Sequence, residues 1–194
     1  MKHEFAEIAQ LVVHERQGRD RGLWDQMRRC YTEDATVWLN WFKGSAREFI
    51  AASQGTVADG NSSIHRLGPP VIDQHGDRAL IDLPAIIEFR TGFDGVEADL
   101  AMYARLYYRA ERRSSDWLLR SLDAVYIRDT ITAVQPGMHL DISPGDVAAH
   151  RPSYRFWSYV MSRQGFAIDE TSYGDDQPEA ADKFYADSIA WLQG

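Results

Sequence analysis

Three short turns divide residues 63–132 into four long segments with the composition of β-strands. The turns are rich in glycine, aspartate and serine, so consecutive strands should pair antiparallel. Prolines at 69, 70 and 84 predict bulges or edges, and the length of the segments predicts a strongly curved sheet. The segments cover about Ser63–Asp73, Arg78–Thr91, Val96–Arg112 and Trp117–Thr132.

Helical periodicity precedes this sheet. An apolar face over residues 5–12 predicts a first helix that ends near Gly18, and residues 23–31 predict a second, short helix. Residues 35–42 are rich in valine and tryptophan and predict one further strand. Ser45 and Glu48 have the spacing of a capping box, which predicts a third helix over about 46–53, followed by a polar loop over 54–62.

After Pro136 the pattern becomes helical again. Residues 154–164 have helical spacing with Gly165 at the C-terminal cap, and Pro178 suits the first turn of a last helix. Helices that are segregated from antiparallel strands predict an α+β domain over residues 1–135. The helical extension over 136–194 should pack on this domain or on a neighbouring subunit.

The composition excludes several functional classes. The chain has 21 basic and 29 acidic residues, a net charge of -8, and no basic tract that could bind nucleic acid or an anionic membrane. No apolar run approaches the ~20 residues of a membrane span, and no motif for a nucleotide cofactor or a zinc site is present. Cys30 is the single cysteine, and we expect its side chain to be buried and to fill space in the core. We therefore expect a cytoplasmic protein without cofactor or metal that binds a small molecule.

Two titratable residues are candidates for chemistry. His65 lies early in the sheet with Ile64 and Arg66 on the opposite face, where it could exchange a proton near neutral pH. Spacing alone favours a structural histidine bound to a backbone carbonyl. Asp20 lies between the first two helices, where the simplest interpretation is a cap of the second helix.

Alternation along the strands gives further candidates. Between residues 96 and 107 one face is apolar and the other carries Tyr103 and Arg105, which suits a polar-lined pocket, a subunit interface or a solvated face. In the last predicted strand, alternation places Asp123 on the same face as Trp117 and Leu119. An acid buried there would have a raised pKa if unpaired, or would form a salt bridge with an arginine.

Trp38 and Asn40 alternate with apolar neighbours on the first predicted strand. Indole side chains are usually part of the core. They could also form the wall of a pocket that binds an aromatic compound. We therefore keep both residues as candidates for substrate binding, together with Tyr103 and Asp123.

The order of these segments resembles the SnoaL-like branch of the nuclear transport factor two-like superfamily. The resemblance covers about residues 4–135 and implies a cone-shaped, cystatin-like α+β barrel. In such a barrel a curved antiparallel sheet wraps around the N-terminal helices and leaves one deep pocket. The resemblance rests on Arg19–Asp25, Cys30–Val37, Phe42–Ser45 with the following Glu48-Phe49, His65–Gly68 and Trp117–Leu119.

Members of this family such as scytalone dehydratase work without a cofactor, using a histidine that abstracts a proton and an aspartate that orients it. Asp20 and His65 match these two places, so the resemblance implies that they form a catalytic pair. It also implies that Arg105 could bind an oxyanion and that Tyr31 could donate to a leaving group.

The implied activity is a lyase that releases water, halide or a small aldehyde from a cyclic or aromatic substrate, in a homodimer or trimer. An isomerase and an epoxide hydrolase are the alternatives with the same fold. A non-catalytic subunit, like the β subunit of a ring-hydroxylating dioxygenase, and a ligand-binding protein are the alternatives without chemistry.

Overall fold

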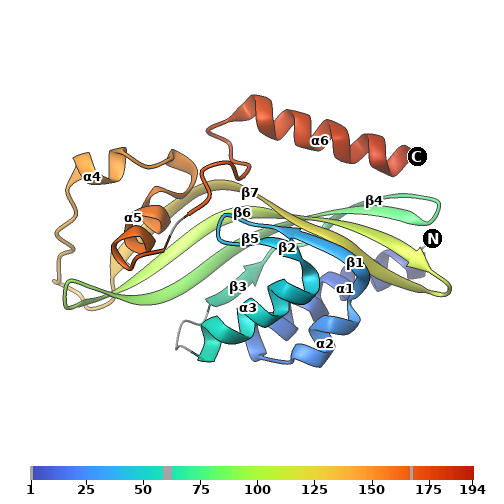
Figure 1. Ribbon diagram of the computed structural model, residues 1–194, viewed down its shortest axis with the longest axis horizontal. Helices are drawn as coiled ribbons and strands as arrows, with labels where there is room; N and C mark the ends of the chain where they lie inside the picture. Colours follow the sequence, from blue (N-terminus) through green and yellow to red (C-terminus); the bar gives the residue numbers. More distant parts are fainter. Residues whose placement is uncertain (1, 59–62, 167) are drawn as a thin grey trace.

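The computed structural model describes residues 2–58, 63–166 and 168–194, and it contains the α+β fold expected from the sequence (Figure 1). Within the described residues, seven strands form one curved sheet in the order β2-β1-β7-β6-β5-β3, with β4 also paired to β5. The sheet is open, because its edge strands do not pair with each other. The strands are β1 (Tyr31–Trp38), β2 (Lys43–Ser45), β3 (Ser63–Leu67), β4 (Val71–His75), β5 (Arg78–Phe93), β6 (Val96–Arg113) and β7 (Asp116–Ala133).

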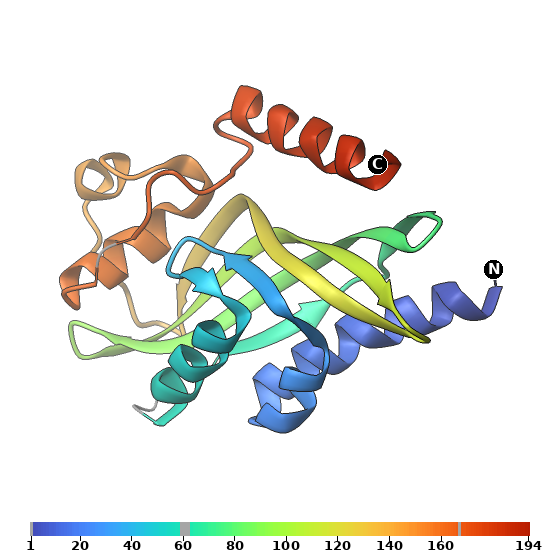
Figure 2. The ribbon, with the colours of Figure 1, turned by 45° about the vertical axis from the view of Figure 1, so that its right-hand side comes forward.

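The helices cover the sheet on both sides, as Figure 2 also shows. The N-terminal helices α1 (Lys2–Arg21), α2 (Trp24–Arg29) and α3 (Ala46–Ala58) gather on one side, and α6 (Pro178–Gln193) lies across the other. The remaining helical segments, α4 (Pro144–Ala148), η1 (Pro152–Tyr154) and α5 (Arg155–Arg163), lie at one end of the long strands. Within the described part of the chain, every helix is too short or too polar to cross a membrane.

The first helix is longer than predicted. It continues past Gly18 to Arg21 and ends at Gly22, whose φ of 67° is readily adopted only by glycine. Gly18 is required for close packing and does not end the helix, since a Cβ atom there would lie 2.9 Å from the Cβ of Met27. It therefore allows α2 to pack closely against α1.

Three other predicted boundaries also change. The strand predicted over 35–42 is β1, which begins at Tyr31 and pairs parallel with β7, so the sheet is not entirely antiparallel. The segment 63–73 was predicted as one strand with a bulge or edge at its prolines, but it is two strands, β3 and β4, on either side of Pro69 and Pro70. Helix α3 continues through residues 54–58, where a polar loop was predicted, and in this stretch the hydroxyl of Thr56 donates to the backbone carbonyl of Ser53 at 2.9 Å. The rest of that loop, 59–62, lies outside the described residues.

An irregularity in β7 changes which face its side chains occupy. The register between β6 and β7 shifts between Arg109 and Ala110, where Arg109 pairs with Ser121 but Ala110 pairs with Leu119. Trp117 and Leu119 therefore belong to the main core, while Asp123 lies on the opposite face. The prediction that these three side chains share a face was wrong, because regular alternation does not hold across a bulge.

The capping box at the start of α3 is confirmed. The backbone N–H of Glu48 donates to Ser45 Oγ at 3.2 Å, and the backbone N–H of Ser45 donates to Glu48 Oε2 at 3.0 Å. The two C-terminal helices also lie close to their predicted positions, with Gly165 in the left-handed region after α5 and Pro178 in the first turn of α6.

Helix α6 packs on the outer face of the sheet through an apolar cluster of its own. Phe184 is buried there, stacked on Tyr173 at 4.4 Å and edge-on to Tyr107 of β6 at 5.3 Å between ring centroids. Leu80 and Val125 of the sheet complete the contact. The C-terminal extension thus packs on the domain of its own chain.

We predict that Phe184→Ala destabilises the protein by about 3–5 kcal/mol, because it removes a buried aromatic ring and leaves a cavity. Urea unfolding followed by circular dichroism measures this change. Ile189→Ala on the same helix is the control, since Ile189 is 49% exposed and its truncation should change stability by less than about 0.5 kcal/mol. Equal losses from the two variants would contradict the docking of α6 through Phe184.

Candidate active site

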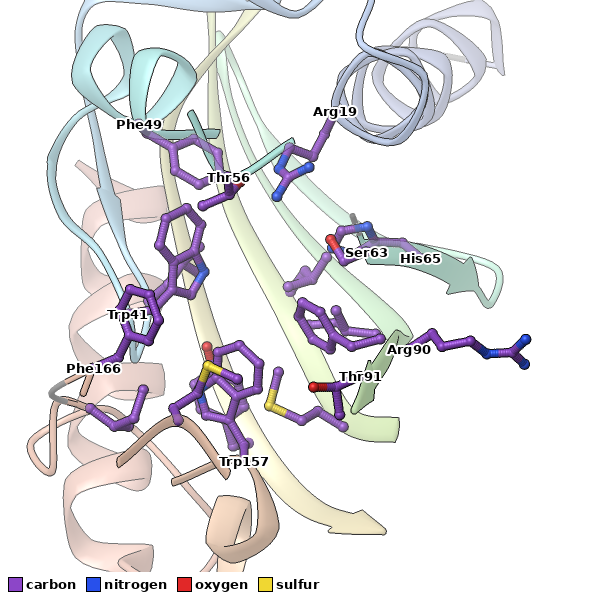
Figure 3. Close-up of a pocket in the computed structure, with 18 of the residues that line it drawn as sticks. Arg19, Trp41, Phe49, Thr56, Ser63, His65, Arg90, Thr91, Trp157 and Phe166 are labelled. Carbon is purple, nitrogen blue, oxygen red and sulfur yellow. The ribbon is translucent and has the colours of Figure 1, made fainter. Parts of the chain in front are cut away.

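A cavity of about 170 Å³ lies between the N-terminal helices, the sheet and the C-terminal segment (Figure 3). It is similar in size to a ~150 Å³ protein cavity that accommodates benzene. Its walls are mainly apolar and aromatic, with Trp41, Phe49, Phe89 and Met102 among them. The polar groups Arg16, Arg19, Ser63 and His65 also line it. Such a cavity suits a small molecule with an apolar body and at least one polar group.

Asp20 and His65 are in direct contact beside this cavity. His65 Nδ1 lies 2.6 Å from Asp20 Oδ1, and the backbone N–H of His65 donates to Asp20 Oδ2 at 2.9 Å. Asp20 lies in the last turn of α1 and does not cap α2, whose N-cap residue Leu23 makes no side-chain hydrogen bond. The capping interpretation was therefore wrong. Because an acid near a helix C-terminus is disfavoured by the helix dipole, Asp20 is placed for its contact with His65 and not for the stability of α1.

The protonation states follow from these contacts. Burial lowers the pKa of His65, and the charges of Arg16 and Arg19 lower it further, against the opposing effect of Asp20. Burial acts to raise the pKa of Asp20, but the hydrogen bonds and charge of His65 outweigh it and hold that pKa below its usual value. At neutral pH the pair is therefore a carboxylate and a neutral imidazole. Nδ1–H donates to Asp20, and Nε2 keeps its lone pair.

Among the described residues, Nε2 of His65 has one hydrogen-bonding contact. Arg16 Nη1 lies 3.3 Å away, at the long limit of a hydrogen bond. The guanidinium of Arg16 is held on its other side by the carboxylate of Glu15, which is completely buried. A substrate must therefore reach Nε2 beside Arg16, in an environment that contains a fixed positive charge.

Tyr31 belongs to this buried network and is absent from the cavity lining. Its hydroxyl donates to Glu15 Oε1 at 2.9 Å, and the hydroxyl of Tyr108 donates to Glu15 Oε2 at 3.1 Å. The structure therefore places Tyr31 behind Arg16, where it positions Glu15. The predicted contact between Tyr31 and a leaving group does not agree with this location.

Arg105, Tyr103 and Trp38 also lie away from the cavity. Arg105 projects from the outer face of β6 and forms two hydrogen bonds of 2.7 Å with Asp82. Tyr103 lies on the same face, with the guanidinium of Arg128 4.5 Å from its ring centroid. Trp38 packs against Tyr173 at 5.6 Å. Of the three interpretations of this face, the polar-lined pocket does not agree with the structure, while the subunit interface and the solvated face stay predictions. The chain's own C-terminal segment covers part of the face at Tyr107.

Asn40 is buried and Asp123 is half-buried, and neither lines the cavity. Burial raises the pKa of Asp123 to about 6, as predicted for an unpaired acid, and Ser121 donates to it at 3.2 Å. The backbone N–H of Asn40 donates to the hydroxyl of Tyr126 at 3.2 Å. Since Tyr126 lines the cavity, Asn40 acts on the site only through a neighbour.

Sequence reasoning missed the two arginines of α1 and the whole far wall of the cavity. Arg16 and Arg19 continue the buried face that begins at Ile8 and Val12, so helical periodicity could have identified them. No local sequence pattern identifies Trp157 of α5 or Phe166 as a cavity residue, because both reach the cavity only when the C-terminal segment folds back onto the sheet. Asp129 of β7 fixes this segment by accepting the backbone N–H of Trp157 at 2.7 Å.

No cluster of three or more histidine, cysteine, aspartate or glutamate side chains suitable for a metal ion occurs among the residues that the structure describes.

Comparisons with known proteins agree with this fold. The sequence profile of the SnoaL-like domain family matches residues 3–123. Pea pathogenicity protein 2 from Fusarium vanettenii is 26% identical over 91% of this chain and 80% of its own length. A hexachlorocyclohexane dehydrochlorinase of type 2 superposes with a TM-score of 0.59 at 14% identity, over 74% of this chain and 95% of that one. A scytalone dehydratase-like protein from Novosphingobium aromaticivorans has a TM-score of 0.54 at 14% identity, over 72% and 93% of the two chains.

We predict that the ring signals of His65 titrate below pH 6.5 in an NMR experiment, because the buried imidazole is held neutral. Asp20→Asn should lower the pKa of His65 further, since the carboxylate that favours the imidazolium is removed. The signals of the exposed His75 are the internal control and should be the same in both proteins. An unchanged titration of His65 in the variant would contradict the contact.

Proposed function

The chain belongs to the SnoaL-like domain family, and on this basis we propose that it is a cofactor-independent lyase that acts on a small cyclic or aromatic compound. The observation that carries the proposal is the contact of 2.6 Å between Asp20 and His65 beside a largely apolar cavity. The names of two proteins with the same fold, a dehydrochlorinase and a scytalone dehydratase-like protein, describe eliminations of this kind. A cytoplasmic location and a homodimer or trimer belong to the same proposal.

In the proposed reaction, Nε2 of His65 takes a proton from a substrate carbon. The electron pair of the broken C–H bond forms a C=C bond, and the leaving group departs on the adjacent carbon with the electron pair of its own bond. Asp20 holds the ring through Nδ1 and stabilises the imidazolium that forms. His65 then returns to its neutral state by releasing the proton to the leaving group or to water.

The alternatives make different predictions. A non-catalytic subunit does not need the Asp20–His65 contact, so that contact favours an enzyme over a subunit. An isomerase would use the same pair to return the proton to another carbon. Elimination and isomerisation therefore share the first step and differ in whether a leaving group departs.

We predict that His65→Ala and Asp20→Asn each lower kcat by about 10²–10⁴-fold, the usual contribution of a positioned general base. The assay is NMR in D2O with a panel of aromatic and cyclic alcohols and halides, which reports deuterium incorporation and loss of the leaving group separately. His75→Ala, at the exposed end of β4, is the matched control and should keep full activity. Incorporation without elimination would indicate an isomerase, and neither signal with any compound would favour a ligand-binding protein.

The proposal also predicts a pH profile. Because His65 must be neutral to accept a proton, kcat/KM should fall on the acid side with an apparent pKa below 6.5. The rate should be constant above this limb until another group titrates. A rate that rises as the pH falls through this range would exclude His65 as the base.

A further inference from the structure

Arg19 has no partner among the described residues, although it is 95% buried. It comes from the last turns of α1, and its side chain points into the cavity (Figure 3). The residue is only 5% exposed, and no hydrogen bond or ion pair joins its guanidinium to another described residue. Its neighbour Arg16 differs in this respect, since the carboxylate of Glu15 is bound to it. A buried charge without a partner is unfavourable, so proteins rarely keep one without a use.

Neither nearby acid forms a hydrogen bond or ion pair with Arg19 in the described part of the chain, although the charges of Asp20 and Glu15 both favour its protonated form. Glu15 accepts hydrogen bonds from Arg16, Tyr31 and Tyr108. Both carboxylate oxygens of Asp20 accept hydrogen bonds from His65. Burial and the charge of Arg16 lower the pKa of Arg19 to about 10, which leaves it protonated at neutral pH.

A second donor lies in the same part of the cavity wall. Ser63 is buried and lines the cavity between Arg19 and His65 in Figure 3, and its hydroxyl makes no hydrogen bond with the described residues. A guanidinium and a hydroxyl that both face an enclosed space match the oxygens of a carboxylate, which a guanidinium binds in a bidentate manner. The aromatic walls would receive the rest of such a molecule.

We propose that the cavity selects compounds that carry a carboxylate, which binds to Arg19 and Ser63 while the apolar body of the compound lies against Trp41, Phe49 and Phe89. The carboxylate contributes to binding and does not react. The carbon that reacts lies elsewhere in the molecule, within reach of His65. This inference deepens the proposed function, because it names the substrate class of the same cavity. The binding itself requires no turnover.

The bound anion would also affect His65. The positive charge of Arg19 is one of the causes that lower the pKa of His65. A carboxylate on Arg19 offsets that charge, so binding should raise the pKa of His65 and make it a stronger base. A neutral compound in the same cavity cannot have this effect.

The test compares benzoate with its neutral isostere benzamide. Titration calorimetry and the fluorescence of Trp41 and Trp157, which line the cavity, report binding, and NMR reports the titration of His65. The wild-type protein should bind benzoate about 10- to 100-fold more tightly than benzamide, which is the usual effect of hydrogen bonds to a charged group. Arg19→Gln should remove this preference and leave the affinity for benzamide unchanged.

Arg90→Gln is the matched control. Arg90 also lines the cavity, but its guanidinium points away from it in Figure 3 and binds Asp99 at 2.9 and 3.0 Å. This variant should keep the preference for benzoate. Arg19→Lys, which retains the charge, should keep part of it.

Thermal unfolding separates a binding role from a structural one. Because Arg19 has no partner to lose, Arg19→Gln should have the same Tm as the wild-type protein or a higher one. A lower Tm together with an unchanged preference for benzoate would overturn the proposal, as would equal affinities for the two compounds or no binding of either at millimolar concentration. A preference for benzoate that depends on Arg19 would hold even if no substrate of the panel is turned over, so the two proposals fail separately.

Discussion

The burial of the charged end of α1 is the constraint on which the rest of the site depends. Glu15, Arg16 and Arg19 are almost completely removed from solvent, and Asp20 is nearly so. Charges in such a place need partners. The sheet supplies them through Tyr108 of β6 and His65 of β3, so the requirement for pairing fixes how α1 crosses the sheet. Of these four charges, Arg19 is the one without a hydrogen bond or ion pair among the residues that the structure describes.

The cavity exists because the sheet is long, curved and open. Strands β5, β6 and β7 extend beyond the surface that the N-terminal helices can cover. The C-terminal segment covers the remaining part with α5, which is fixed by Asp129 and by the stacking of Trp157 on Phe89 at 4.6 Å. The Asp20–His65 pair and the arginines therefore come from the N-terminal part of the chain, and the far wall comes from its C-terminal part.

Local patterns of the sequence predicted much of the fold, but by themselves they favoured structural roles for Asp20 and His65. Turn chemistry identified the long hairpins, and the capping box identified the start of α3. The family resemblance brought Asp20 and His65 together correctly. The prediction that Arg105 and Tyr103 line the pocket does not agree with the structure. Alternation separates the two faces of a strand but does not show which face packs against the helices. The prediction that Asp123 and Trp117 share a face was wrong because a bulge in β7 interrupts the alternation.

The sequence by itself therefore determined the elements, their order and the buried face of α1, because these depend on contacts between residues that are close along the chain. Only the tertiary structure decided which face of the sheet borders the cavity, that Tyr31 supports Glu15 instead of meeting a substrate, and that Trp157 closes the far wall. Each of these depends on contacts between residues far apart in the chain, whose geometry follows from sheet curvature, register and the docking of the C-terminal segment.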